Sequence, residues 1–143
     1  AAEFWQTFSE WIDHHNPRMS YSVARNLFIA SRIESSALKS AQLVKQQATE
    51  RMKSLLPRGT LLCLPTTPFC APRVNLPIHE TDALRLQISV LCCHGGLTGV
   101  PHVSIPGATT GPDNAPIGLS IIAGHNYDTD LLAASLALEA QHD

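Results

Sequence analysis

The chain has 143 residues, a formal net charge of −2 and 44% apolar residues, which suits one globular domain with a sizeable core. A nearly neutral charge argues against a nucleic-acid-binding surface, because such a surface needs a basic surplus. No apolar run reaches the roughly 18 residues that a membrane span requires, and the N-terminus lacks the basic and apolar regions of a signal peptide. We therefore expect neither a nucleic acid nor a membrane as a partner.

Three helices are predicted in the N-terminal part of the chain. Aromatic and apolar residues at helical spacing indicate a first helix that begins near Phe4 and ends near Asp13. A second helix is expected over residues 22–33. The third carries an apolar stripe over residues 38–55, and Pro57 ends it.

A strand and a long loop follow these helices. The run TLLCLP, residues 60–65, is continuously apolar, which is typical of a central strand buried on both faces with parallel neighbours. Either the two later strands flank it, or its neighbours belong to sequence that this chain does not contain. The proline-rich stretch PTTPFCAPRVNLP, residues 65–77, predicts an ordered irregular loop.

The C-terminal half is predicted to contain a helix, a hairpin and a last helix. The apolar run ALRLQISVLCC favours a helix that Thr81 or Asp82 opens and His94-Gly95-Gly96 ends. The stretch GLTGVPHVSIPGATTGPDNAPIGLSIIAG then predicts a hairpin beside a pocket, with strands at VSI and IGLSIIA. Asp128 or Thr129 is expected to cap the last helix, LLAASLALEA.

No catalytic constellation can be assembled from these residues. There is no GxSxG nucleophile elbow and no HExxH pair, and the seven histidines are scattered. The four cysteines fit neither a zinc site nor a redox pair, so we predict no metal, no cofactor and a reducing compartment, the cytoplasm. Glycines and prolines near the strand ends do suggest the walls of a ligand pocket.

Three segments of the chain carry a family resemblance. LLCLPTTPFCAP, GLTGVPHVSIP and APIGLSIIAG followed by DTDLL are similar, in this order, to segments late in amidase signature enzymes. The resemblance covers about residues 55–140, and the sequence of these segments is most similar to the indole-acetamide hydrolase-like subgroup.

The resemblance implies a fold and an activity. The fold is α/β, the C-terminal part of the amidase signature fold, with helices packed on the strands of a mixed central sheet. The family hydrolyses linear, non-peptide carboxylic amides to an acid and ammonia or an amine. Its nucleophilic serine is activated by a second serine and a lysine, without a cofactor.

The resemblance also implies that the catalytic part is missing. The family's lysine and serines lie in an earlier Gly/Ser-rich stretch, and this sequence has none. The sequence IESSALK, residues 33–39, is similar to part of that stretch but lacks glycines. Ser35, Ser36 and Lys39 are therefore interpreted as a helix start. Residues 1–143 are thus expected to be an incomplete C-terminal segment, inactive alone. Its expected partners are a small-molecule amide and either a second copy or the missing part of the same enzyme.

The residues that could line a substrate pocket come from two segments. By position, the PTTP loop and the loop over residues 93–98 are the candidates. Their site residues are Thr66, Thr67, Cys93, His94, Gly95 and Gly96. The alternative hypothesis is a non-catalytic amidase-like module that binds or acts as a scaffold.

Overall fold

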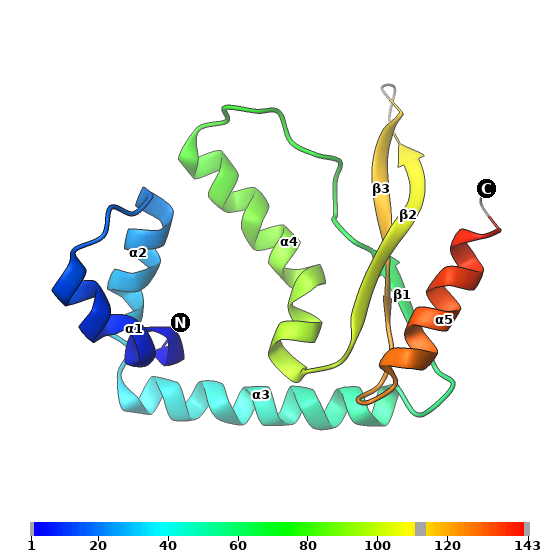
Figure 1. The fold of residues 1–143 in the computed structure, drawn as a ribbon, viewed down its shortest axis with the longest axis horizontal. Coiled ribbons are helices and arrows are strands. Elements are labelled where there is room, and N and C mark those ends of the chain that lie inside the picture. Colours follow the sequence, from blue (N-terminus) through cyan, green and yellow to red (C-terminus); the bar gives the residue numbers. More distant parts are fainter. Residues whose placement is uncertain (1, 111–113, 142–143) are drawn as a thin grey trace. The chain divides into compact units, whose positions relative to one another are not determined.

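The structure, a computed structural model, describes residues 2–110 and 114–141 of the chain (Figure 1). In these residues it contains five helices and a three-stranded sheet, which confirms the expected α/β class. The chain divides into two units, Ala1–Val44 and Lys45–Asp143. No helix in the described residues combines the length and apolar character needed to cross a bilayer.

The first unit is helical. It consists of α1 (Ala2–His15), α2 (Tyr21–Ala30) and the first part of α3 (Ser35–Leu55). α2 ends three residues before the predicted boundary, because the chain already turns at Ser31. The interpretation of Ser35 and Ser36 as a helix start is confirmed.

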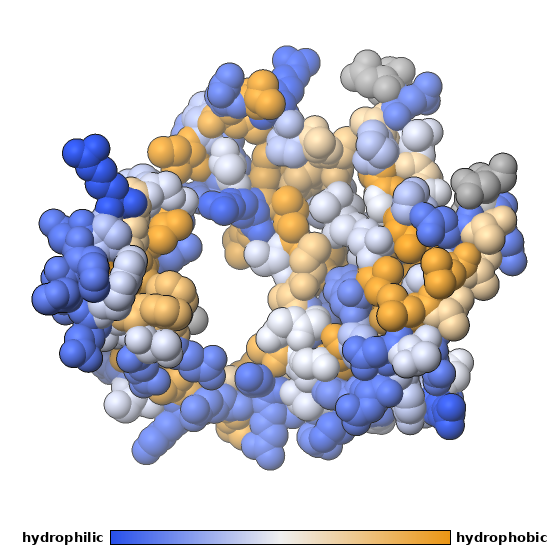
Figure 2. Space-filling view, viewed as in Figure 1, coloured by the Kyte–Doolittle hydropathy of each residue, from blue (hydrophilic) through white to orange (hydrophobic). Residues whose placement is uncertain are grey.

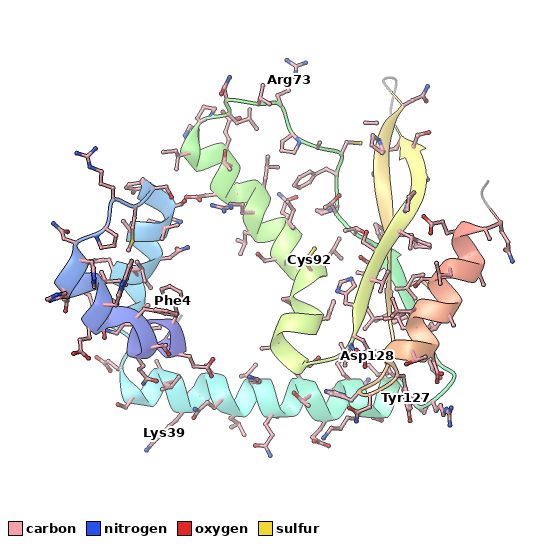
Figure 3. The ribbon with its side chains drawn as sticks, viewed as in Figure 1. Phe4, Lys39, Arg73, Cys92, Tyr127 and Asp128 are labelled. Atoms are coloured by element: carbon pink, nitrogen blue, oxygen red, sulfur yellow. The ribbon has the colours of Figure 1, made fainter. Side chains whose placement is uncertain are left out.

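α1 and α2 are in contact within the first unit. Leu27 and Ala30 are the buried side chains of α2, whereas α1 buries none of its own. A hollow of about 390 Å³ lies between the two helices and is lined by Phe4, which Figure 3 labels, and by Val23. The apolar stripe of α3 is mostly solvent-exposed, since its only buried residue is Met52, in the second unit.

The second unit is built on an antiparallel sheet with the strand order β1-β3-β2. Its strands are β1 (Leu62–Pro65), β2 (His102–Thr110) and β3 (Ala115–Ile122). β2 and β3 form the predicted hairpin, with Ser104 opposite Ser120. Part of the predicted connection, residues 111–113, lies outside the described residues.

The prediction of a strand at TLLCLP is confirmed, and the alternative in which the two later strands flank it is wrong. The other alternative, neighbours in sequence that this chain does not contain, stays a prediction. β1 pairs only with β3 among the described strands, and the pairing is antiparallel. Both later strands therefore lie on the same side of β1 instead of flanking it. Leu62 remains 37% exposed, so β1 is an edge strand in the described part of the chain.

Two apolar clusters cover the two faces of this sheet. On one face, Leu131 of α5 (Asp128–Glu139) packs with Ile105 and Ile121. On the other face, Met52 and Leu56, at the end of α3, pack with Val100, Leu64 and Ile122. The sheet is thus the structural centre of the second unit, as Figure 1 shows for α5 and the end of α3.

The helices α4 and α5 begin earlier than the sequence predicts. α4 (Ile78–Thr98) starts three residues before Thr81, because Pro77 is its N-cap residue. α5 starts at Asp128 with Tyr127 as N-cap, so neither Asp128 nor Thr129 caps it. Asp128 lies in the first turn, where a carboxylate complements the helix dipole.

Large apolar side chains remain at the surface of the second unit. Leu86 and Val90 of α4 are 71% and 65% exposed, and Leu136 of α5 is 66% exposed. Figure 2 shows a group of apolar side chains at the surface over α5. Apolar side chains that gather at the surface in this way over α5 are typical of a face that another protein segment covers.

Candidate functional site

The candidate residues of the second segment lie in a helix and not in a loop. Cys93, His94, Gly95 and Gly96 occupy the last turns of α4, which continues to Thr98. The predicted helix end at His94-Gly95-Gly96 was therefore wrong. The helix ends at Gly99, whose φ of 77° lies in the left-handed region and whose N–H donates to Gly95 O over 2.8 Å.

Local contacts explain why α4 continues through two glycines. A Cβ at Gly95 would lie 3.2 Å from Val100 O and 3.4 Å from the Cβ of His102, so a glycine there permits close packing. The hydroxyl of Thr98 donates to His94 O over 2.8 Å, and this bond ties the last turn together. Gly95 serves tight packing of the helix end instead of chain flexibility.

Thr66 lies at the junction of the three strands and α4. Its N–H donates to Gly118 O over 2.8 Å, and its carbonyl oxygen accepts from Cys92 Sγ over 3.2 Å. Its Oγ1 lies 2.7 Å from Ser104 Oγ and 2.9 Å from Ser120 Oγ. We call Thr66, Ser104 and Ser120 the hydroxyl cluster.

The backbone of β3 comes close to the hydroxyl cluster. A Cβ at Gly118 would lie 2.7 Å from Ser104 Oγ and 2.8 Å from Thr66 Oγ1. A side chain larger than hydrogen at residue 118 would therefore separate these two hydroxyls. Glycine at this position is a condition for the cluster.

The structure joins the two candidate segments through a residue that the sequence reasoning missed. Cys92, labelled in Figure 3, makes the contact between α4 and Thr66. Thr67 donates its hydroxyl to Phe69 O over 2.7 Å, so its hydrogen is used within the loop. Of the candidates, Thr66 is the one at the centre of a network.

Ser104 and Ser120 were also missed, although the sequence held a signal for them. Each arm of the predicted hairpin carries one serine, in HVSIP and in GLSII. Register partners in an antiparallel pair project from the same face of the sheet. Ser104 and Ser120 are such partners, so pairing the two arms in this register would have placed their hydroxyls together.

Two histidines meet where α4 leads into β2. Burial lowers the pKa of His102 below its usual 6.5, and the nearby His94 lowers it further. A lowered pKa keeps the imidazole of His102 neutral near pH 7.

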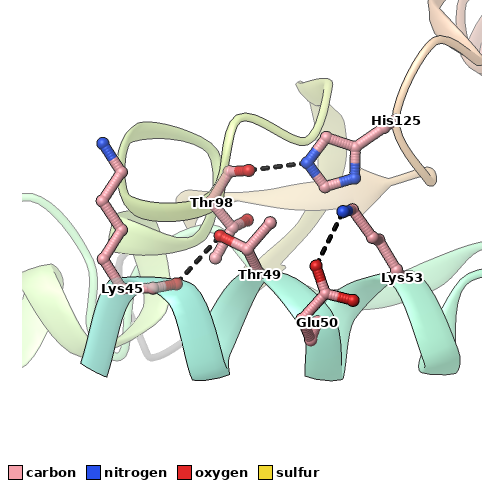
Figure 4. A network of polar contacts seen from close by, with 6 residues as sticks. All are labelled: Lys45, Thr49, Glu50, Lys53, Thr98 and His125. Atoms are coloured by element: carbon pink, nitrogen blue, oxygen red, sulfur yellow. Dashed lines mark hydrogen bonds and ion pairs between the residues drawn. The ribbon is translucent and has the colours of Figure 1, made fainter. Parts of the chain in front are cut away.

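A third histidine holds the end of α4. His125 Nε2 lies 2.6 Å from Thr98 O, and Figure 4 shows this hydrogen bond. It joins the C-terminal end of α4 to the segment after β3. Figure 4 also shows the ion pair of Lys53 with Glu50 on α3, at 2.8 Å.

Among the described residues, the arrangement is suited to binding, and it places no base beside a hydroxyl of the cluster. A catalytic hydroxyl needs a base within hydrogen-bond distance, and the hydroxyl cluster has no imidazole, amine or carboxylate bonded to it in the described part of the chain. Residues 2–110 and 114–141 also hold no group of three or more side chains that could bind a metal ion. The cluster can donate and accept hydrogen bonds.

Comparisons with known proteins point to one family. A family model described as "Amidase" matches residues 2–132. The chain is similar to Amidase 1 of Oryza sativa subsp. japonica, with 26% identity over 92% of this chain and 30% of the relative. Amidase 1 of Arabidopsis thaliana is 24% identical over 96% of this chain and 32% of the relative. The chain thus spans about a third of the length of these relatives.

Other similarities are shorter or concern the fold alone. A glutamyl-tRNA(Gln) amidotransferase subunit of Paenarthrobacter aurescens is 26% identical over 71% of this chain and 19% of the relative. A crystal structure of an amidase has a TM-score of 0.75 at 22% identity, covering 98% of this chain and 33% of that one. The corresponding amidotransferase subunit of Thermotoga maritima has a TM-score of 0.56 at 18% identity, over 83% and 26%.

Proposed function

This chain belongs to the amidase family, and on that basis we propose that it is the C-terminal part of an enzyme that hydrolyses carboxylic amides. The observation that carries the proposal is the family match over residues 2–132, nearly the whole chain. The order of the three late amidase segments in this sequence supports the C-terminal placement. A span of about a third of the Amidase 1 relatives agrees with it.

In this proposal the nucleophile comes from a segment that this sequence does not contain. A base-activated serine attacks the amide carbonyl, the amine leaves, and water then hydrolyses the acyl-enzyme. Backbone N–H groups stabilise the oxyanion. The second serine and the lysine of the centre lie in the same earlier segment, so residues 1–143 alone are inactive.

The part played by this chain is to form walls of the substrate pocket. Thr66 and Thr67 after β1 form one wall, and Cys93, His94, Gly95 and Gly96 at the end of α4 form the other. Cys92 supports this division of roles, because its hydrogen bond to Thr66 O holds the two walls side by side. The four free thiols support a cytoplasmic location.

The comparisons favour an amidase over an amidotransferase subunit. The Amidase 1 relatives match over 92% and 96% of the chain, and the amidotransferase relatives over 71% to 73%. The structural similarity is also higher to the amidase, with TM-scores of 0.75 and 0.56. We therefore propose small amides as substrates, with indole-3-acetamide among those to assay.

The experiment is a comparison of the full-length protein with residues 1–143. Ammonia release from benzamide, indole-3-acetamide and a simple aliphatic amide is measured for both. We expect turnover by the full-length protein only, abolished by a serine-directed reagent. Turnover by residues 1–143 would show that the nucleophile lies in this chain, and no turnover by either protein would favour a non-catalytic binding module.

A further inference from the structure

The burial of the three hydroxyls, together with the one hydrogen that each carries, indicates the direction of the hydrogen bonds in the hydroxyl cluster. Ser120 is 1% exposed, and within the described residues the sole hydrogen-bond partner of its hydroxyl is Thr66 Oγ1. A buried donor without an acceptor is unfavourable. The hydrogen of Ser120 is therefore donated to Thr66.

The same reasoning gives the direction of the hydrogen bond between Thr66 and Ser104. A threonine hydroxyl has one hydrogen, and Thr66 Oγ1 already accepts from Ser120. In the described part of the chain, Ser104 Oγ, 2.7 Å away, is the one acceptor left for the hydrogen of Thr66. Thr66 is half-buried and Ser104 is exposed, so Thr66 donates and the unpaired hydrogen belongs to Ser104. The hydrogen of Ser104 has no acceptor in the described part of the chain, and Ser104 is exposed. The chain of bonds runs from Ser120 through Thr66 and leaves one free donor, on Ser104.

The free donor faces an open hollow. The hollow has a volume of about 570 Å³ and is lined by Ser104 together with Pro106, Thr109, Pro116 and Gly118. Pro106 pairs with Gly118 and Thr109 with Pro116, across a bulge at Gly107. These pairs project from the same face of the sheet as Ser104. The wall around the donor is therefore mostly apolar.

We propose that Ser104 is a ligand-binding residue whose hydroxyl donates a hydrogen bond to a carbonyl or carboxylate oxygen of a small molecule. Thr66 is the positioning residue, because it aligns Ser104 and supplies the hydrogen that Ser104 accepts. The backbone of Thr66 is held from both sides, by Gly118 O and by Cys92 Sγ. The identity of the ligand as an amide or its acid product rests on the proposed function.

The test uses two pairs of variants in the full-length protein. Ser104→Ala removes the donor and Ser104→Thr keeps it. Thr66→Val removes the hydroxyl that joins Ser120 to Ser104, and Thr66→Ser keeps that hydroxyl. Ser40→Ala and Thr49→Val are the matched controls, because both hydroxyls bond within α3, to Ser36 O and Lys45 O.

Two probes separate this inference from the proposed function. Binding of benzoate is measured at equilibrium by saturation-transfer NMR, which needs no turnover, and KM and kcat are measured with benzamide. We expect Ser104→Ala to weaken benzoate binding by more than 10-fold, because a hydrogen bond to a charged acceptor is strong, and to raise KM for benzamide about 5-fold. We expect Thr66→Val to weaken benzoate binding and raise KM in the same way. Ser104→Thr and Thr66→Ser should bind benzoate to within about 2-fold of the wild type.

Each outcome decides one of the two claims. Loss of benzoate binding in Ser104→Ala without amide turnover by the wild type would keep this inference and overturn the proposed function. If the wild type hydrolyses amides normally and Ser104→Ala changes neither benzoate binding nor KM, the proposed function would stand and this inference would be overturned. Wild-type protein that binds neither benzoate nor benzamide would overturn the ligand assignment.

Discussion

His125 and Thr98 are joined by a short hydrogen bond, with His125 Nε2 2.6 Å from the carbonyl oxygen of Thr98 (Figure 4). A carbonyl oxygen cannot donate, so Nε2 carries the hydrogen. His125 Nδ1 is buried without a hydrogen-bond partner in the described part of the chain. The bond satisfies one of the carbonyl groups that a helix leaves unpaired at its C-terminus. It thereby fixes the last turn of α4, which carries His94, Gly95 and Gly96.

Removal of this bond should loosen the end of α4. We expect His125→Ala to lower the free energy of unfolding by about 1–2 kcal/mol, since a mostly buried carbonyl loses its donor. The amides of residues 93–99 should then exchange hydrogen faster in mass spectrometry. His79→Ala is the control, because the side chain of His79 is 83% exposed. Unchanged exchange in His125→Ala would show that the bond does not hold the helix end.

The helical conformation of Gly96 predicts opposite effects for two neighbouring glycines. A Cβ at Gly96 would meet nothing within 4 Å, so Gly96→Ala should raise the free energy of unfolding by about 0.5–1 kcal/mol. Gly99 has a φ of 77°, so Gly99→Ala should lower it by about 1 kcal/mol or more. Urea unfolding of both variants measures the difference. Destabilisation by Gly96→Ala would indicate that α4 ends at the glycine pair after all.

The lowered pKa of His102 predicts a pH-dependent stability. Its folded-state pKa lies below the unfolded value of about 6.5, so the unfolded chain binds the proton more readily. The stability contributed by neutral His102 is fully present above pH 6.5 and is lost as the pH falls below that value. His102→Gln should remove this part of the pH dependence, measured as unfolding midpoints between pH 5 and pH 8.

The two causes of the lowered pKa can be separated. Burial is the larger cause and the charge of His94 the smaller. In an NMR titration, His94→Gln should therefore raise the pKa of His102 only in part, leaving it below 6.5. A pKa at or above 6.5 in the wild type would contradict the burial of His102 at this junction.

The exposed apolar side chains predict that residues 1–143 associate when produced alone. Leu86, Val90, Leu132 and Leu136 are each more than half exposed, and β1 has an unpaired edge in the described part of the chain. Such surfaces favour association. A dilution series with light scattering should show larger assemblies for residues 1–143 than for the full-length protein. A stable monomer at all concentrations would count against a missing covering segment.

The sequence predicted most elements because their signals are local. The hairpin of β2 and β3 follows from two apolar runs joined by turn residues, and the start of α3 at Ser35 from a helical pattern. The place of the TLLCLP strand in the sheet could not be predicted from its residues. A short apolar run is compatible both with a strand buried on both faces and with an edge strand that a helix covers on one face. The position of β1 depends on the packing of Leu64 against Met52 and Leu56, which lie at the end of α3.

The site was harder to predict because its contacts are distant in sequence. Thr66 lies 38 residues from Ser104 and 54 residues from Ser120, and only the strand register brings the three hydroxyls together. The glycines at 95 and 96 suggested a flexible loop, because glycine at the end of an apolar run is typical of a helix cap. Within the helix, Gly95 packs closely against Val100 and His102, a contact that local sequence does not report.

We propose that this chain shapes the pocket of an amide hydrolase whose nucleophile lies outside residues 1–143. Labelling of the full-length protein with a fluorophosphonate, followed by peptide mapping in a mass spectrometer, locates the reactive serine. We expect a single adduct on a serine outside this chain and none on Ser104 or Ser120, which serve hydrogen bonding. An adduct on any serine of residues 1–143, or no adduct at all, would contradict it.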